Sequence, residues 1–145
     1  MKVLMQRVKH ARVTVDGECL GAIEHGILAL IGLEKHDSPE ILEKMANKLL
    51  AYRIFSDEAG KMNKSLVDIN GGLLAISQFT LAADTRKGLR PSFSCAAPPA
   101  QAEDAFDAFL ILLRDKHAKV ETGRFAADMQ IELLNDGPVT FMLEM

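Results

Sequence analysis

The stretch GILALIGL, Gly26 to Leu33, is a continuous apolar run with one glycine at its start and another near its end. Such a run is typical of a β-strand that is buried on both faces. The next residues predict an amphipathic helix, because Ser38 suits the N-cap, Pro39 the first helical position and Glu40 the positive end of the helix dipole. The apolar residues on one face of this helix are Ile41, Leu42, Met45, Leu49 and Tyr52.

The same reasoning extends in both directions from this strand and helix. Upstream, MKVLMQRV predicts a strand, and ARVTVDGECLGAI alternates apolar and polar residues around Asp16-Gly17, which indicates a hairpin. Downstream, GGLLAISQFTL (Gly71 to Leu81) predicts a second buried strand. AQAEDAFDAFLILLRDKH then predicts a second helix, whose buried face comprises Ala102, Phe106, Phe109, Leu110 and Leu113.

The C-terminal segment completes the expected fold. KVETGRFAADMQIELLNDGPVTFMLEM predicts two or three closing strands, with a turn at NDGPVT, Asn135 to Thr140. The order is strands, helix, strand, helix, strands. This order predicts an α+β protein with a largely antiparallel β-sheet or barrel covered by two main helices. A length of 145 residues predicts a single domain, residues 1–145.

Composition limits the class of protein. Apolar residues make up 48% and charged residues 26%, which is usual for a globular domain with a core, and the net charge is −3. Because proteins that bind nucleic acid mainly through phosphates are usually basic, any such contact is expected to be local. Two distant cysteines and four scattered histidines indicate neither a disulfide framework nor a metal site. We expect a cytoplasmic protein, since no run has the length of a signal or membrane segment.

Polar residues interrupt the second buried strand at SQFTL, Ser77 to Leu81. One interpretation is a strand end whose polar side chains bind the last backbone groups. The other is a ligand site, in which Thr80 is a nucleophile or an orienting hydroxyl and the N–H groups of the turn form an oxyanion hole. No base is adjacent in the sequence, and these residues by themselves leave both interpretations open.

Two further segments are candidate binding sites. TRKGLRPSF, Thr85 to Phe93, holds a cluster of basic residues in an acidic chain, and it is either a solvated loop or a phosphate-binding one. ETGRFAADM contains two large apolar side chains that either belong to the core or line a pocket. The basic residues are Arg86, Lys87 and Arg90, and the apolar ones are Phe125 and Met129.

The step Gly137-Pro138 within NDGPVT has no side chain on its first residue and no N–H on its second. An X–Pro bond adopts the cis form at a small energetic cost. This backbone patch therefore offers only hydrogen-bond acceptors.

Taken together, SQFTL, KGLRPSF and NDGPVT resemble the D-aminoacyl-tRNA deacylase family, also called D-tyrosyl-tRNA deacylase, and the resemblance covers nearly the whole chain. It includes MKVLMQRV at the start, YRIFSDEAGKMNKSL in the middle and NDGPVTFMLE at the end. The resemblance implies a homodimer that hydrolyses the ester between a D-amino acid and tRNA without a metal or other cofactor, and that also acts on glycyl-tRNA. It implies that Gly137-Pro138 is cis and enters the partner's active site.

The resemblance also implies roles for individual residues. The catalytic turn comprises Ser77, Gln78, Phe79 and Thr80. Gln78 is expected to support this turn, and Phe79 to lie near the adenine of the terminal adenosine. The substrate pocket is expected to include Phe125, Met129 and Arg7, with Arg7 close to the Gly-Pro loop. Arg86, Lys87 and Arg90 are expected at the phosphates of the acceptor stem.

Two mechanisms and one other class of function remain open. In the first mechanism, the N–H groups of Phe79 and Thr80 stabilise the oxyanion and the ribose 2′-OH orients the water. In the second, Thr80 attacks and forms an acyl-enzyme. The alternative class is a non-catalytic dimeric RNA- or nucleotide-binding module, in which SQFT is a structural turn. An esterase for small molecules is disfavoured, because no catalytic triad order is visible.

Overall fold

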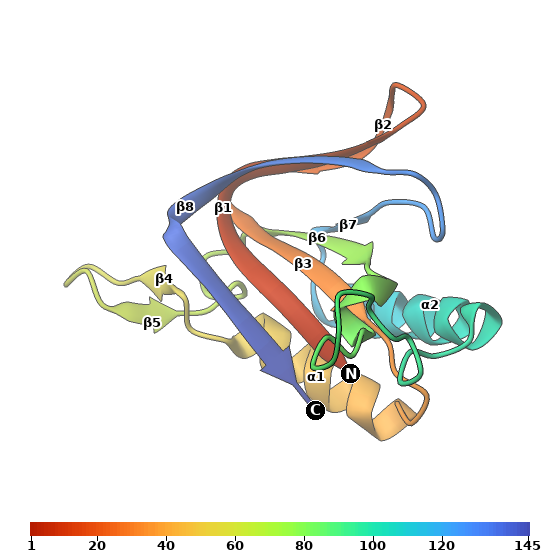
Figure 1. Ribbon diagram of the computed structural model, residues 1–145. Coiled ribbons are helices and arrows are strands. Elements are labelled where there is room, and N and C mark those ends of the chain that lie inside the picture. Colours follow the sequence, from red (N-terminus) through yellow and green to blue (C-terminus); the bar gives the residue numbers. More distant parts are fainter.

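The computed structural model describes all residues, 1–145, and shows one strongly curved sheet with two helices on one side (Figure 1). The main sheet has the order β2-β1-β3-β6-β7, and β8 pairs with β1 along its other edge. Its strands are β1 (Lys2–Val15), β2 (Glu18–Ile23), β3 (Gly26–Gly32), β6 (Gly72–Ser77), β7 (Val120–Thr122) and β8 (Gln130–Glu144). The helices are α1 (Pro39–Ala51) and α2 (Pro99–Lys116). The predicted fold class is thereby confirmed.

Long strand β1 organises the antiparallel half of the sheet. Its first half pairs with β3 and its second half with β2, while β8 pairs with both halves. The predicted hairpin joins β1 to β2, and its turn residues Asp16 and Gly17 have positive φ angles of 51° and 81°. This is the backbone that an Asp-Gly turn favours.

The other half of the sheet is parallel. Strands β3, β6 and β7 run in one direction, because α1 connects β3 to the strands that follow and α2 connects β6 to β7. The glycine that opens GILALIGL is required here, since a Cβ on Gly26 would lie 1.9 Å from the carbonyl oxygen of Gly72. The sheet is therefore mixed, with three antiparallel pairings to β1 and two parallel ones.

Strands β3 and β6 are buried on both faces, as their apolar runs predict. One face packs on the helices: Ser38 caps α1 as expected, and all five residues predicted for the buried face of α2 are buried. The other face packs on the curled end of the sheet, where Val8, Ala11 and Val13 of β1 contact Leu28 and Leu74. The curvature thus gives a partly closed barrel (Figure 1).

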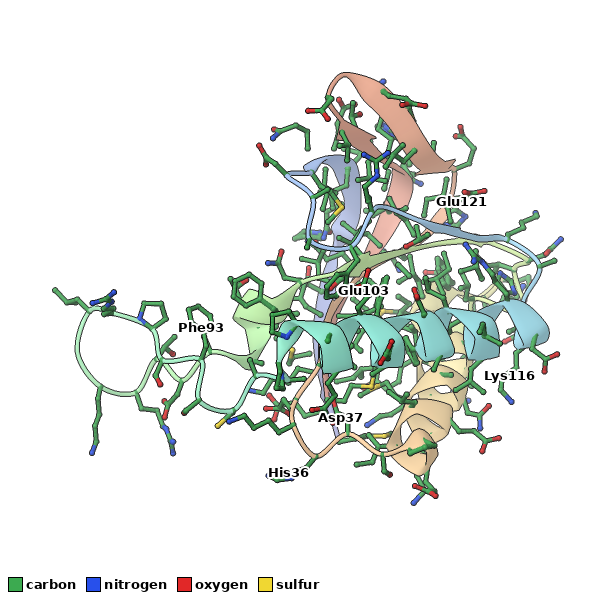
Figure 2. All side chains as sticks on the ribbon, turned by 90° about the vertical axis from the view of Figure 1, so that its right-hand side faces the viewer. His36, Asp37, Phe93, Glu103, Lys116 and Glu121 are labelled. Atoms are coloured by element: carbon green, nitrogen blue, oxygen red, sulfur yellow. The ribbon has the colours of Figure 1, made fainter.

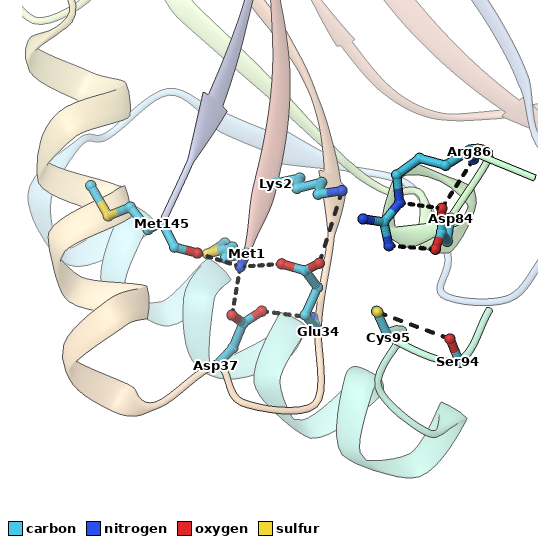
Figure 3. A network of polar contacts seen from close by, with 9 residues as sticks. All are labelled: Met1, Lys2, Glu34, Asp37, Asp84, Arg86, Ser94, Cys95 and Met145. Carbon is cyan, nitrogen blue, oxygen red and sulfur yellow. Dashed lines mark hydrogen bonds and ion pairs between the residues drawn. The ribbon is translucent and has the colours of Figure 1, made fainter. Parts of the chain in front are cut away.

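The N-terminal residue is buried in this core and hydrogen-bonded to the C-terminal one. The α-ammonium group of Met1 donates to Asp37 at 2.6 Å, to Glu34 at 2.8 Å and to the carbonyl oxygen of Met145 at 2.8 Å (Figure 3). The Met1 side chain is itself part of the large hydrophobic cluster. None of the helices has the length and apolar character that crossing a membrane requires.

Two predicted boundaries are wrong. Strand β6 ends at Ser77, and the 3₁₀ helix η1 (Phe79–Ala82) follows, so the strand does not continue to Leu81. The expected turn at NDGPVT is instead a bulge inside the single strand β8. Between Gln6 and Val8, β1 advances by two residues, whereas β8 covers the five steps from Asn135 to Thr140. The chain keeps its direction because β1 is long enough to pair with β8 on both sides of the bulge.

A small hairpin formed by β4 (Phe55–Ser56) and β5 (Met62–Lys64) extends from the body of the molecule on the side of the β8 bulge (Figure 1).

Candidate active site

A cavity of about 730 Å³ opens at the C-terminal end of β6. Strand β6 and η1 form one wall, the loop before α2 and the start of that helix form another, and the segment that leads into β8 closes the third. Eleven of the 16 lining residues are hydrophobic. They are Lys35, Ile76, Ser77, Gln78, Phe79, Phe93, Ala96, Ala97, Pro98, Pro99, Ala102, Phe125, Ala126, Ala127, Met129 and Ile131.

The Ser-Gln-Phe-Thr turn lies at this cavity. The N–H of Gln78 donates to the Ile31 carbonyl at 2.7 Å, which ties the turn to β3. The side-chain amide of Gln78 donates to Thr80 Oγ1 at 2.6 Å. Ser77, Gln78 and Phe79 line the cavity, whereas Thr80 lies behind them on the surface and does not.

The backbone of this turn offers hydrogen-bond donors. Phe79 and Thr80 are the first residues of η1, where N–H groups have no acceptor within the helix. Gln78 occupies the N-cap position but makes no side-chain capping bond to them, because its amide is directed to the Thr80 hydroxyl. A buried strand thus ends in free N–H groups beside an apolar cavity.

No side chain at the cavity is a suitable general base. The lining residues include no His, Asp, Glu or Cys, and Lys35 is the only charged one. Among the histidines, buried His117 is bound to the Gly71 carbonyl at 2.7 Å, and His25 packs edge-on against Phe55. No group of three or more His, Cys, Asp or Glu side chains is placed to hold a metal ion.

Aromatic side chains flank the cavity. The rings of Phe79 and Phe93 lie 5.1 Å apart between centroids, and these residues are 57% and 39% exposed. Two such exposed rings form a surface on which a planar base can stack. Phe125 and Met129 line the cavity and also pack against the core, so the two interpretations of ETGRFAADM both apply.

The basic cluster lies on an exposed loop next to the cavity. Hydrogen bonds between the backbones of Asp84 and Ser92 close the loop, and Figure 2 shows it projecting beyond the start of α2. The Arg86 guanidinium donates to both oxygens of Asp84, at 2.9 Å and 2.7 Å, and these bonds hold the pKa of that carboxyl well below its usual value (Figure 3). Lys87 and Arg90 are exposed and form no ion pair.

The Gly137–Pro138 peptide bond is cis, the isomer that the resemblance implies, and Gly137 has a φ of +131°. Arg7 links the bulge to the segment before β4. Its Nε donates to the Asp136 carbonyl at 3.1 Å and its Nη1 donates to the Ile54 carbonyl at 2.7 Å. Asn135 closes the bulge, since its Oδ1 accepts the Val139 N–H at 2.9 Å.

The bulge and the cavity of the same chain do not meet. Neither Gly137 nor Pro138 is among the cavity-lining residues, and Arg7 lies at the bulge and not at the cavity. Arg7 thus contacts the Gly-Pro loop of its own chain, and its expected place in the substrate pocket stays a prediction.

Sequence reasoning missed several cavity residues. Lys35 gave no signal, because a single lysine after a strand is usually solvated. The wall formed by Ala96 to Pro99 lies between TRKGLRPSF and the second helix, in a stretch that no predicted site includes. Its Pro98-Pro99 step begins the second helix and could have marked this wall.

Comparisons with known proteins show the family to which the chain belongs. The model of the family D-Tyr-tRNA(Tyr) deacylase matches residues 4–144. A D-aminoacyl-tRNA deacylase of Saccharophagus degradans is 65% identical over 145 residues, covering 100% of both chains. One of Teredinibacter turnerae is 65% identical over 144 residues, covering 99% of both.

Two solved structures are also similar. The c-Myc DNA Unwinding Element Binding Protein superposes with a TM-score of 0.96 at 43% identity, covering 100% of this chain and 99% of that one. A probable eukaryotic D-amino acid tRNA deacylase shares the fold, with a TM-score of 0.87 at 17% identity and coverage of 99% and 98%. On the family match and the identity of its relatives, the chain belongs to the D-Tyr-tRNA(Tyr) deacylase family.

Proposed function

We propose that the protein hydrolyses the ester bond between a D-amino acid and tRNA, and likewise that of glycyl-tRNA, releasing free amino acid and tRNA. The family match and the relatives named D-aminoacyl-tRNA deacylase support this reaction. The role is translation quality control, and its compartment is the cytoplasm, where aminoacyl-tRNA is used.

The main support for the proposal is that free backbone N–H groups lie beside a cavity that has no general base. An aminoacyl ester is already activated, so a side-chain base is not essential. The N–H groups of Phe79 and Thr80 stabilise the oxyanion as water adds to the carbonyl carbon. The neighbouring ribose 2′-OH orients this water and relays its proton to the departing 3′ oxygen. No step requires a metal.

The position of the Thr80 hydroxyl favours this mechanism over an acyl-enzyme. Thr80 Oγ1 accepts the Gln78 amide at 2.6 Å, and Thr80 does not line the cavity. A threonine nucleophile needs a base to take its proton, and no such base lies at the cavity.

The second part of the proposal is a homodimer whose active sites lie at the subunit interface. Gly137 and Pro138 lie outside the cavity of their own chain, so a partner subunit supplies them. The cis Gly-Pro step then presents carbonyl acceptors to the substrate ammonium. An L side chain would strike these carbonyls, whereas the hydrogen of glycine and a D side chain avoid them. Rejection by a rigid group leaves the identity of the D side chain free.

The cavity and the basic loop bind different parts of the tRNA. The terminal adenosine occupies the cavity, with its base near Phe79 and its sugar and acyl group between the Ser77–Thr80 turn and the Phe125–Met129 wall. Arg86, Lys87 and Arg90 contact phosphates of the acceptor stem. Neutralising them weakens tRNA binding and reduces its salt dependence, because each phosphate contact releases counterions.

The decisive experiment incubates purified protein with D-tyrosyl-tRNA and, in parallel, L-tyrosyl-tRNA, each with and without a chelator. Release of free D-tyrosine in both buffers, with L-tyrosyl-tRNA intact, is the expected result. Hydrolysis of both enantiomers at equal rates contradicts chiral selection, and hydrolysis abolished by the chelator contradicts a mechanism without metal.

A second candidate function is nucleic-acid binding without catalysis. The structural similarity to a protein named for binding a DNA element favours it, as does the exposed basic loop. In that case the protein would bind D-tyrosyl-tRNA and leave the ester intact, and uncharged tRNA would bind equally well.

A further inference from the structure

Lys35 is the only charged residue at a mostly apolar cavity. It lies three residues beyond the end of β3 and, as an exposed residue that lines the cavity, it is at the rim. Apolar walls and aromatic rings suit a purine base, but they provide nothing for the charge that a nucleotide carries. A single ammonium group at the rim provides the missing interaction.

The backbone of Lys35 is fixed to the wall formed by the loop before α2 and the start of α2. Its N–H donates to the Cys95 carbonyl at 3.2 Å, and its carbonyl accepts the Gln101 side-chain amide of α2 at 3.1 Å. The preceding residue, Glu34, forms a β-bridge with Ala96. The Lys35 Cα is therefore held at the rim, and only the flexible side chain remains to reach a ligand.

The ammonium group of Lys35 has no partner within the protein. The ion pairs of the molecule do not include it. The nearby carboxylates are already engaged, as Figure 3 shows: Glu34 and Asp37 bind the Met1 ammonium, and Asp84 binds Arg86. Other surface lysines are also unpaired, but none of them lines this cavity.

We propose that Lys35 binds the phosphodiester on the 5′ side of the terminal adenosine, an inference that rests on the proposed function. The reacting ester is attached to the ribose of this nucleotide, so the ester lies at the Ser77–Thr80 turn while the base occupies the apolar cavity. The 5′ oxygen must then leave across the rim towards the rest of the tRNA. Lys35 neutralises this first phosphate, and the basic loop contacts phosphates further along the chain.

The experiment compares three substrates that differ in their phosphates: 3′-O-D-tyrosyl-adenosine, the same compound with a 5′-phosphate, and D-tyrosyl-tRNA. For Lys35→Ala we expect KM to rise by about 5- to 20-fold on the two phosphorylated substrates, as for a charge-assisted contact at a partly exposed site. On the adenosine ester the variant equals the wild type. Lys35→Arg keeps the positive charge, so its KM on the phosphorylated substrates is expected to stay close to that of the wild type.

Two control variants isolate the contribution of this position. Lys87→Ala in the basic loop is expected to affect only D-tyrosyl-tRNA, whereas Lys61→Ala in the β4–β5 hairpin is expected to affect none of the substrates. An equal loss on the adenosine ester and its 5′-phosphate overturns the inference, because it indicates a structural role for Lys35. Unchanged KM values on all three substrates overturn it as well.

A binding measurement separates this inference from the proposed function. Adenosine 5′-monophosphate and adenosine are titrated by calorimetry into the wild type and Lys35→Ala. The wild type is expected to prefer the monophosphate and the variant to lose that preference. If the wild type prefers the monophosphate and the variant does not, but no D-aminoacyl-tRNA is hydrolysed, the proposed reaction is contradicted and the phosphate site at Lys35 is supported. A preference that survives in the variant overturns the site even if hydrolysis is found.

Discussion

Replacing Gly137 with alanine tests whether the bulge in β8 selects the handedness of the substrate. A Cβ at this position would lie 2.8 Å from Val139 Cγ2 and 3.0 Å from Arg7 Nη2, with φ at +131°. Holding a non-glycine residue in such a conformation costs about 1–3 kcal/mol. Both the bulge and its Arg7 support must therefore shift by several tenths of an ångström.

The shift is expected to act on selectivity more than on folding. Misplacing a positioned group by about 1 Å reduces the rate by up to roughly 10²-fold, so this smaller shift should slow hydrolysis of D-tyrosyl-tRNA by less than that. Hydrolysis of L-tyrosyl-tRNA is not expected to fall in proportion, because the displaced carbonyls no longer exclude its side chain. The ratio of the two kcat/KM values should drop by about 10-fold or more, since an unfavourable contact of a few kcal/mol is removed.

The matched control is Gly60→Ala. Gly60 also has a positive φ, +76°, but a Cβ there meets nothing within 4 Å. Gly60→Ala therefore carries a backbone cost of about 1–2 kcal/mol without a clash. Kinetics with both enantiomers are measured together with sedimentation of the two variants. A Gly137→Ala protein that sediments like the wild type and keeps its full D-over-L ratio would refute the reasoning.

Three further variants test the site and its support. Thr80→Ala removes one hydrogen-bond partner of Gln78, a loss of ~0.5–1.5 kcal/mol. We therefore expect kcat to fall by only about 2- to 13-fold. If Thr80 were the nucleophile, kcat would fall by about 10³-fold or more. A 2′-deoxy terminal ribose should slow turnover far more than Thr80→Ala. Asn135→Ala leaves the Val139 N–H without its acceptor, at a cost of about 1–3 kcal/mol, so the D-over-L ratio should fall. Asn135→Asp keeps the acceptor oxygen and should therefore retain most of the wild-type ratio. Asp37→Asn weakens the pair with the buried Met1 ammonium, and urea unfolding should show a loss of about 1–3 kcal/mol, while Glu43→Gln on the surface of α1 changes stability by less than about 0.5 kcal/mol.

The titration of Asp84 gives a pH test of the basic loop. The hydrogen bonds from Arg86 lower the folded-state pKa of Asp84 below its usual value of 3.8. A lowered carboxyl pKa stabilises the fold above the unfolded-state value, and this contribution is lost as pH falls through the folded-state pKa. The loop is therefore expected to keep its structure from neutral pH to below 3.8, which carboxyl NMR of Asp84 can follow. A titration near or above 3.8 contradicts the pairing.

The elements of the fold were predictable because their signals are local. The apolar run from Gly26, the Ser38-Pro39 helix start and the Asp16-Gly17 turn each depend on the conformational preferences of a few adjacent residues. All three form as expected. The family resemblance was also contained in short motifs of the sequence, and the comparisons confirm it.

The errors arose where distant strands decide the outcome. Asn135 to Thr140 has the residues of a turn, yet both of its flanks pair with β1, so the chain bulges and continues. The end of β6 at Ser77 is likewise set by η1 and by the bond from Gln78 to Ile31 in β3, and the apolar pattern alone does not contain this information.

The sequence by itself determined the elements, the class of fold and the family, because hydrophobic periodicity, capping and motif residues act over short stretches of chain. Only the tertiary structure decided that Lys35, Phe93 and Met129 share one cavity while Gly137 lies outside it. Those relations depend on how a curved sheet brings together residues far apart in sequence, and no local preference specifies that curvature.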